Sequence, residues 1–295
     1  MWNDRDEFDK RFDEQWDKAD KHFWFVRRVA LIVLAIVLGV VGFGVYLAGV
    51  AVNAWGAPVV IGSSGDYVSG IAQHRYGKLN GNVIADVRFV NIESTSPWRT
   101  VAEGGQDANI RRWAQGLRGQ GPRLVSFSHE PMSKKNRHLG TAASYKAAMR
   151  HVEDIFEAEG VSNVEWVWNA TSDSFRGDHQ RGRRWYPGDH WVDVIAGESF
   201  NRIGCGFTES ASFGAQVKEI FAFSRQHHKK FLVAEFASNR GHHRAAWLRD
   251  ARRFITVNKT AFRGAFYFNS NEHAEGCEWR LGRSEKRILR TFGGI

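Results

Sequence analysis

The sequence predicts an α/β protein: a (β/α)8 TIM barrel preceded by a single transmembrane helix. Two observations lead to this fold class. After about residue 56, strand-like runs alternate with helix-like stretches, which is typical of parallel β-α-β units. Before that point, residues 29–52 form one mostly apolar run without a charge. We therefore divide the chain into a charged segment (1–28), a membrane segment (29–52) and a barrel domain (53–295).

The apolar run is long enough to cross a membrane. As an α-helix rising about 1.5 Å per residue, it spans roughly 36 Å, whereas a hydrocarbon core is about 30 Å thick. Two arginines (27–28) precede it directly, and the next basic residue is Arg75. The positive-inside rule then predicts a cytoplasmic N-terminus and an extracytoplasmic barrel domain. A signal peptide cleaved near residues 52–54 is the alternative, but the apolar run exceeds the usual signal length, which favours a signal anchor.

The first 28 residues contain an apolar stripe. Phe8, Phe12, Trp16, Ala19 and Phe23 follow one another at steps of three or four residues, as on one face of a helix. Such a helix would lie on the inner membrane surface or pair with a partner helix. A solvated, charged tail is the alternative interpretation.

The barrel prediction depends on the number and order of the segments. Helix-like stretches lie between most strand candidates, for example residues 108–121 and residues 141–160, which Thr141 opens and Gly160 closes. Seven or eight such units in roughly 240 residues fit a closed barrel. An open doubly wound sheet is the alternative, but residues 61–70 do not match its G-x-G-x-x-G turn. The strand candidates are residues 58–62, 83–92, 123–130, 164–170, 192–200, 230–238 and 263–269.

The amino-acid composition limits the classes of molecule that the chain is expected to bind. The net charge of +9 favours anionic surfaces, but no nucleic-acid motif is present, so we expect no nucleic-acid partner. The twelve tryptophans are either core residues or flat surfaces that stack on sugar rings. Cys205 and Cys277 are too few for a disulfide scaffold or a cysteine zinc cluster.

Two glutamates stand at or near strand ends. Glu130 ends one strand candidate, and Glu235 lies within another, three candidates further along. Catalytic side chains of barrels project from the carboxyl ends of strands, so the two carboxyls can face each other across the barrel mouth. Glycoside hydrolysis needs such a pair, one as proton donor and one as nucleophile or base. A lone glutamate there would be a salt-bridge residue, whereas the pair favours catalysis.

Other chemistries lack their motifs. The His129-Glu130 pair does not continue into the zinc motif H-E-x-x-H, because residue 133 is serine and Pro131 prevents the helix. The histidine pairs at residues 227–228 and 242–243 are interpreted as surface residues. A G-x-S-x-G elbow is absent from the sequence. We therefore expect no metal and no cofactor.

Several segments, in this order, resemble glycoside hydrolase family 26. The stretch QDANIRRWAQGLRGQGPRLVSFSHEPM (106–132) is similar to a helix that leads to a strand ending in His-Glu-Met. VEWVWNAT (164–171) looks like the strand that carries W-x-W before an asparagine turn. The remaining similar segments are WYPGDHWVDVIAGESFN (185–201), FLVAEFAS (231–238) and CEWRLGRSEKRILRTF (277–292).

The resemblance implies a retaining β-glycanase. Members of the family are mostly endo-β-mannanases, and some act on β-glucans or β-1,3-xylan. By this resemblance, Glu130 is the general acid/base and Glu235 is the nucleophile. His129 contacts the sugar near the cleaved bond, and Trp168 lines the cleft. We add Trp98 as a further substrate-binding candidate.

The chain also departs from the family pattern. Phe200 stands where the family usually has a tyrosine that hydrogen-bonds to the nucleophile, and Glu198 adds a third carboxylate to the mouth. Both are candidate substrate-binding residues. Residues 58–122 must hold what three β-α units normally fill, so we expect one unit to be reduced.

The sequence therefore predicts a membrane-anchored retaining glycosidase that cleaves a β-linked polysaccharide outside the cytoplasmic membrane. That substrate would be mannan-like, a β-glucan or an envelope glycan, and the basic charge hints at an anionic one. The alternatives are a non-catalytic glycan-binding protein on a degenerate barrel and an envelope scaffold protein. A Cys205–Cys277 disulfide is expected, since both cysteines follow strands on the active-site side.

Overall fold

The computed structural model describes residues 59–62, 66–68, 71–74, 88–177, 181–269 and 276–290. The predicted N-terminal segment (1–28) and membrane segment (29–52) lie outside these ranges. Among the helices within them, none combines the length and apolarity that crossing a bilayer requires.

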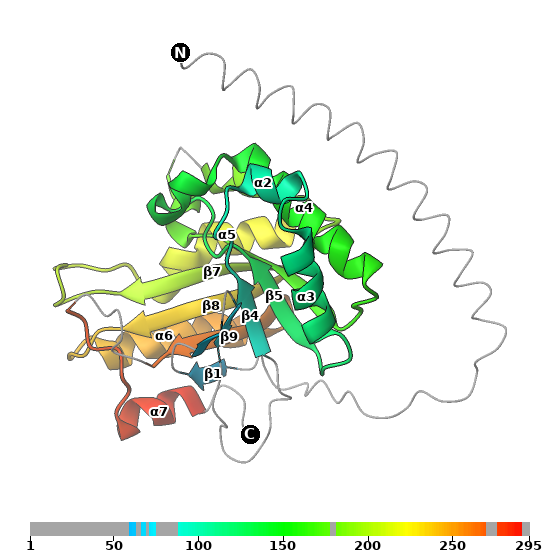
Figure 1. Ribbon diagram of the computed structural model, residues 1–295. Helices are drawn as coiled ribbons and strands as arrows, with labels where there is room; N and C mark the ends of the chain where they lie inside the picture. Colours follow the sequence, from blue (N-terminus) through cyan, green and yellow to red (C-terminus); the bar gives the residue numbers. More distant parts are fainter. Residues whose placement is uncertain are drawn as a thin grey trace, which may run out of the picture. The chain divides into compact units, whose positions relative to one another are not determined.

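The described strands form one nine-stranded sheet in the order β1-β9-β8-β7-β6-β5-β4-β3-β2 (Figure 1). The pairs from β4 through β9, and β9 with β1, are parallel. The strands are β1 (Val59–Gly62), β2 (Asp66–Val68), β3 (Ile71–His74), β4 (Arg88–Ile92), β5 (Arg123–Phe127), β6 (Val164–Asn169), β7 (Val194–Asn201), β8 (Lys230–Ser238) and β9 (Phe262–Phe268).

The strand order distinguishes a barrel from a doubly wound sheet. A doubly wound sheet reverses its order at a switch point. Here the order from β4 to β9 follows the chain, and the first strand returns to pair with the last, as in a curled sheet of the (β/α)-barrel type. Between β1 and β4, the described residues hold β2 and β3; β3 pairs antiparallel with both β2 and β4. This antiparallel pair occupies the place where we expected a reduced β-α unit.

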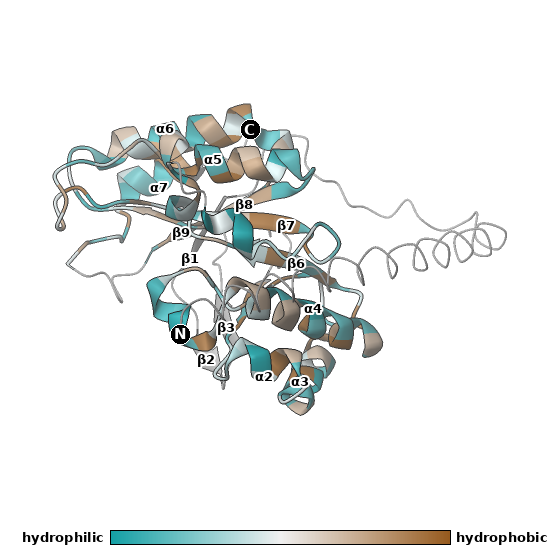
Figure 2. Ribbon diagram, turned by 90° about the horizontal axis from the view of Figure 1, so that it is seen from above, coloured by the Kyte–Doolittle hydropathy of each residue, from teal (hydrophilic) through white to brown (hydrophobic). Residues whose placement is uncertain are grey.

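Helices cover the outside of this sheet. Figure 2 shows α5 and α6 on one side of the strands and α3 and α4 on the opposite side. The predicted helix at residues 141–160 is confirmed as α4, whose N-cap Thr141 forms a reciprocal capping box with Ser144. The helices are α2 (Trp98–Ala102), α3 (Asp107–Leu117), α4 (Ala142–Ala158), α5 (Phe213–Gln226), α6 (Arg244–Val257) and α7 (Arg283–Arg290). Short 3-10 helices are η1 (Lys134–Leu139), η2 (Ser172–Phe175), η3 (Arg181–Trp185) and η4 (Lys259–Ala261).

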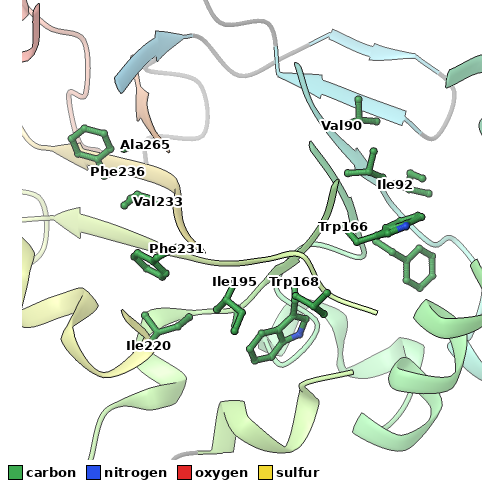
Figure 3. Packing of buried hydrophobic residues seen from close by; sticks show 14 of the residues in the cluster. Val90, Ile92, Trp166, Trp168, Ile195, Ile220, Phe231, Val233, Phe236 and Ala265 are labelled. Atoms are coloured by element: carbon green, nitrogen blue, oxygen red, sulfur yellow. The ribbon is translucent and has the colours of Figure 1, made fainter. Parts of the chain in front are cut away.

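The buried side chains form two layers. The inner layer comes from strands alone and fills the inside of the curl. The outer layer lies between strands and helices, and Figure 3 shows part of it. Along β8, Leu232 and Ala234 belong to the inner layer, and Phe231 and Val233 belong to the outer one. This alternation is the period of two expected for a strand, and it identifies the face on which a polar side chain reaches the barrel mouth. The inner layer is Phe89, Leu124, Val167, Val194, Ala196, Leu232, Ala234 and Phe266.

Two contacts fix the chain after β9 to the rest of the barrel. Cys205, after β7, forms a disulfide with Cys277, after β9, with 5.1 Å between their Cα atoms, which confirms the predicted pairing. Arg244 at the start of α6 is 1% exposed and donates hydrogen bonds to three backbone carbonyls, those of residues 239, 278 and 280.

Candidate active site

The residues that follow β5 leave the strand through an unusual backbone. Ser128 has φ of 52° and Glu130 has φ of 50°, both in the left-handed region that non-glycine residues rarely adopt. Each such residue costs on the order of 1 kcal/mol, so neighbouring groups must hold it in place. The Ser128 N–H donates to the Ile92 carbonyl at 2.8 Å, and the Glu130 N–H donates to the Asn169 carbonyl at 3.2 Å. The two flanking strands, β4 and β6, thereby fix the turn that presents Glu130.

Two buried side chains hold the same turn in place through hydrogen bonds. The Asn136 amide of η1 donates to the carbonyls of His129 (2.7 Å) and Glu130 (3.1 Å). The Trp98 indole N–H donates to the Ser128 hydroxyl at 2.9 Å. Neither Asn136 nor this role of Trp98 was predicted, because both act through the backbone or a neighbour rather than through a motif.

His129 is held as a neutral donor. Its Nδ1 lies 2.6 Å from the Asn169 amide nitrogen and accepts that hydrogen bond, so we assign the proton to Nε2. Burial lowers the pKa of His129 to about 4, which keeps the ring uncharged at neutral pH. Nε2 lies 3.7 Å from Glu130 Oε1. His129 is thus a fixed N–H group beside the proposed acid/base.

A β-bulge places Glu235 on the inner face of β8. Gly197 of β7 is opposite Val233, but the next residue, Glu198, is opposite Glu235, so Ala234 is an extra residue in β8. One extra residue reverses the faces of those that follow it. Accordingly, Phe236 points outward and packs against Phe213 of α5 and Trp247 of α6. Without the bulge, Glu235 would face the helices.

Glu198 lies beside Glu235 on the neighbouring strand. It shares the inner face with Ala196 and Val194, two and four residues earlier in β7. Both of its carboxyl oxygens accept the Ser172 N–H, at 3.0 and 3.2 Å. Glu198 is therefore a fixed third carboxyl in the mouth.

The three carboxyls share a poorly hydrated site, and this favours their protonated forms. Burial raises the pKa of Glu130, while Lys135 and Arg202 oppose the shift. Burial and the nearby Glu130 charge raise the pKa of Glu235 to about 7. Burial, Glu130 and Glu235 raise the pKa of Glu198 well above its ordinary value. In glycosidases, one carboxyl group keeps its proton and acts as the acid, while its neighbour loses its proton and acts as the nucleophile.

A cavity of about 520 Å³ opens next to these residues. Glu130 and Glu198 line it together with Phe200 and Phe207, and the Phe207 side chain is 56% exposed. An exposed phenyl ring in a polar cavity offers a flat surface for a sugar ring. Phe207 was not predicted, because no motif marks it.

The predicted site residues separate into three groups. Glu130, Glu198 and Phe200 line the cavity. His129 and Glu235 do not line it, but each interacts with Glu130. Trp98 and Trp168 are both fully buried, and Trp168 packs against Phe175, Tyr186 and Phe223. Neither ring faces the cleft, so their prediction as substrate-binding residues is corrected: they are core residues, as the packing interpretation of the tryptophans allowed.

The chain is similar to known glycoside hydrolases in sequence. The family model described as Glycosyl hydrolase family 26 matches residues 134–252, which include Glu235 and begin four residues after Glu130. Endoglucanase H of Acetivibrio thermocellus is 26% identical over 310 residues, covering 88% of this chain and 32% of that protein. The chain thus spans about a third of this curated relative.

Solved structures show the same fold. The family 26 β-mannanase of Bacteroides ovatus matches with a TM-score of 0.50 and 16% identity, covering 68% of this chain and 62% of that one. The endo-β-1,4-glucanase Xac0029 of Xanthomonas axonopodis pv. citri matches with a TM-score of 0.50 and 13% identity, covering 70% and 73%. The similarity to glycoside hydrolase family 26 that the motifs predicted is confirmed, and together with the relatives it supports a glycosidase.

Proposed function

We propose that the chain is a membrane-anchored retaining β-glycoside hydrolase that cleaves a β-linked polysaccharide by double displacement. One observation carries the proposal. Glu130, in the turn after β5, and Glu235, within β8, lie close enough for the charge of Glu130 to raise the pKa of Glu235. The resemblance of the surrounding motifs to family 26 implies the roles of acid/base and nucleophile for these two positions, and the family-model match includes Glu235.

We take the role of each carboxyl from the family resemblance. Glu235 attacks the anomeric carbon while Glu130 gives its proton to the departing sugar oxygen, and a glycosyl ester forms on Glu235. Glu130 then takes a proton from water, which attacks the same carbon and releases Glu235. The His129 Nε2–H, held by Asn169, is placed to donate to a sugar hydroxyl or to the Glu130 carboxylate. Candidate substrates are mannan-like polymers, β-glucans and envelope glycans.

Product release from a panel of β-linked polysaccharides tests this function. The full chain is expected to release reducing sugars from at least one polymer, with retained anomeric configuration by proton NMR. Glu130→Gln should lower kcat/KM by about 10²- to 10⁴-fold, and Glu235→Ala should lower it at least as much. Glu103→Gln, whose carboxylate is exposed on the far end of α2, is the matched control and should stay active. Wild-type rates in either site variant would contradict the assignment.

The membrane anchor rests on residues 29–52, which lie outside the described residues. Arg27-Arg28 before this run supports a cytoplasmic N-terminus and an extracytoplasmic barrel. Protease added to intact cells should therefore degrade the barrel domain and spare an N-terminal epitope tag. Protection of both ends, or loss of the tag alone, would contradict this topology.

Phe200 favours a second candidate function, non-catalytic glycan binding. Its ring packs near Phe268 and Trp279 and offers no hydroxyl to Glu235. Glycan binding by calorimetry without any released sugar, across the whole panel, would support this candidate over hydrolysis.

A further inference from the structure

The cavity beside Glu130 has a strongly basic lining. Its lysine and arginine residues are Lys134, Arg137, Arg176, Arg181 and Arg202, which we call the cationic rim. Beyond Glu130 and Glu198, the acidic lining residues are only Asp173 and Glu209, and Asp173 is already paired with Arg176. The five basic residues exceed the four acidic lining residues by one charge, and by three where Glu130 and Glu198 keep their protons.

Two of these cations are available to a ligand. The side chains of Lys134 and Arg137 are exposed, and within the ranges that the structure describes neither makes an ion pair. They stand three residues apart in η1, hence on one side of a 3-10 turn. Asn136 ties the same turn to the carbonyls of His129 and Glu130. The backbone that carries the two charges is thus held beside the proposed acid/base.

Two other segments of the chain contribute the rest of the rim. Arg176 and Arg181 come from the segment after β6, and Arg202 follows β7, with its guanidinium 5.6 Å from the centre of the Phe200 ring. Cations from three segments thus line one cavity together with exposed Phe207. A neutral polysaccharide would offer no anionic group to Lys134 and Arg137.

We infer that the substrate is a polyanionic β-glycan, whose carboxylate, sulfate or phosphate groups pair with the cationic rim while its sugar rings occupy the cavity. This inference rests on the proposed function and specifies its substrate class. Arginine suits the role because its planar guanidinium pairs with such groups through two parallel hydrogen bonds. The pairing is exposed to solvent, so it should weaken as salt concentration rises.

Matched oligosaccharides provide the test. The full chain carrying Glu235→Gln, which binds without cleaving, is titrated with β-1,4-mannuronan, sulfated β-1,4-mannan and neutral β-1,4-mannan of equal length. At least one anionic ligand should bind about tenfold more tightly than the neutral one, since each exposed ion pair is worth up to about fivefold. This advantage should shrink in high salt. Equal affinity for all three ligands would overturn the inference.

Charge-reversal variants test whether the cationic rim causes the preference for the anionic ligand. Lys134→Glu with Arg137→Glu should abolish the preference for the anionic ligand. The control is Lys218→Glu with Arg253→Glu, which makes the same change in net charge at exposed positions of α5 and α6. A preference that survives the rim reversal would show that Lys134 and Arg137 do not bind the anionic groups. A preference that the control removes equally would show that overall charge is responsible. Either result would refute the rim.

Different results would refute the proposed substrate class and the proposed reaction. Release of sugar from neutral mannan or β-glucan, with no preference for anionic ligands, would leave the proposed hydrolysis standing and refute the anionic substrate. Binding to anionic ligands through the rim, with no sugar released from any polymer by the wild type, would support recognition of anionic glycans and refute the proposed hydrolysis.

Discussion

Replacing Glu235 by glutamine should stabilise the protein at alkaline pH, although it removes the proposed nucleophile. Burial and the Glu130 charge raise the pKa of Glu235 from 4.5 to about 7 in the folded chain. Below pH 4.5, the carboxyl is protonated in both the folded and the unfolded state, and it does not affect stability. As pH rises from 4.5 through 7, the unfolded chain loses this proton more readily than the folded chain does. The free energy of unfolding therefore falls across this window.

The size of the effect follows from the shift in pKa. One pKa unit corresponds to about 1.4 kcal/mol, so the shift from 4.5 to about 7 costs the folded state about 3 kcal/mol at pH 8. Glutamine has nearly the same shape and no charge to desolvate. We expect Glu235→Gln to be about 3 kcal/mol more stable than the wild type at pH 8 and to match it within a few tenths at pH 4. Such a gain on losing a catalytic group is the usual trade of stability for function.

Urea unfolding of the full chain at pH 4 and pH 8, followed by tryptophan fluorescence, measures this difference. Glu209→Gln is the control: its carboxylate is exposed, so its removal should change the free energy of unfolding by no more than about 0.5 kcal/mol at either pH. If Glu235→Gln gains nothing at pH 8, or gains equally at both pH values, the Glu235 carboxyl is not buried among like charges and the site geometry is wrong.

Three further predictions concern the scaffold and the reaction. Replacing both Cys205 and Cys277 by alanine opens a loop of 72 residues and should cost about 4 kcal/mol, or a Tm lower by about 10 °C; two free thiols in the unreduced wild type would contradict the bond. Arg244→Met should cost at least about 2 kcal/mol in urea unfolding, because three carbonyls, one buried and two partly buried, lose their charged donor; an unchanged midpoint would mean that water replaces it. Activity should rise as pH passes about 7, where Glu235 loses its proton. With an aryl glycoside that needs no acid catalyst, Glu130→Gln should move this rise to lower pH, and an unmoved rise would refute the coupling of the two carboxyls.

The fold was predictable because its signals are local. Each strand candidate from residue 123 onward corresponds to an observed strand, and α4 begins after its predicted cap, Thr141. Apolar periodicity and capping residues act over a few positions, so a single sequence reveals them. The antiparallel pair β2 and β3 was not foreseen in detail, because the direction of a strand depends on its partner rather than on its own residues.

The tryptophans show where local signals fail at the site. Trp98 and Trp168 have the flat surfaces expected of a sugar-binding cleft, yet both are fully buried. The indole of Trp98 instead holds the turn before Glu130 through the Ser128 hydroxyl. Residue type indicates what a side chain can bind, whereas only the packing of distant segments decides whether it meets solvent. Phe207, which no motif marks, is exposed in the cavity for the same reason.

Glu235 makes this point most directly, because its sequence signal and its geometry disagree until the bulge is considered. By strict alternation from Leu232 on the inner face, Glu235 would point outward into the apolar layer under the helices. A buried, unpaired carboxylate there would cost several kcal/mol. The extra residue Ala234 removes this conflict by turning Glu235 inward beside Glu198 and Phe236 outward onto α5 and α6. The register of β8 against β7 is a property of two strands together, and so the role of Glu235 could be inferred from its motif while its position could not.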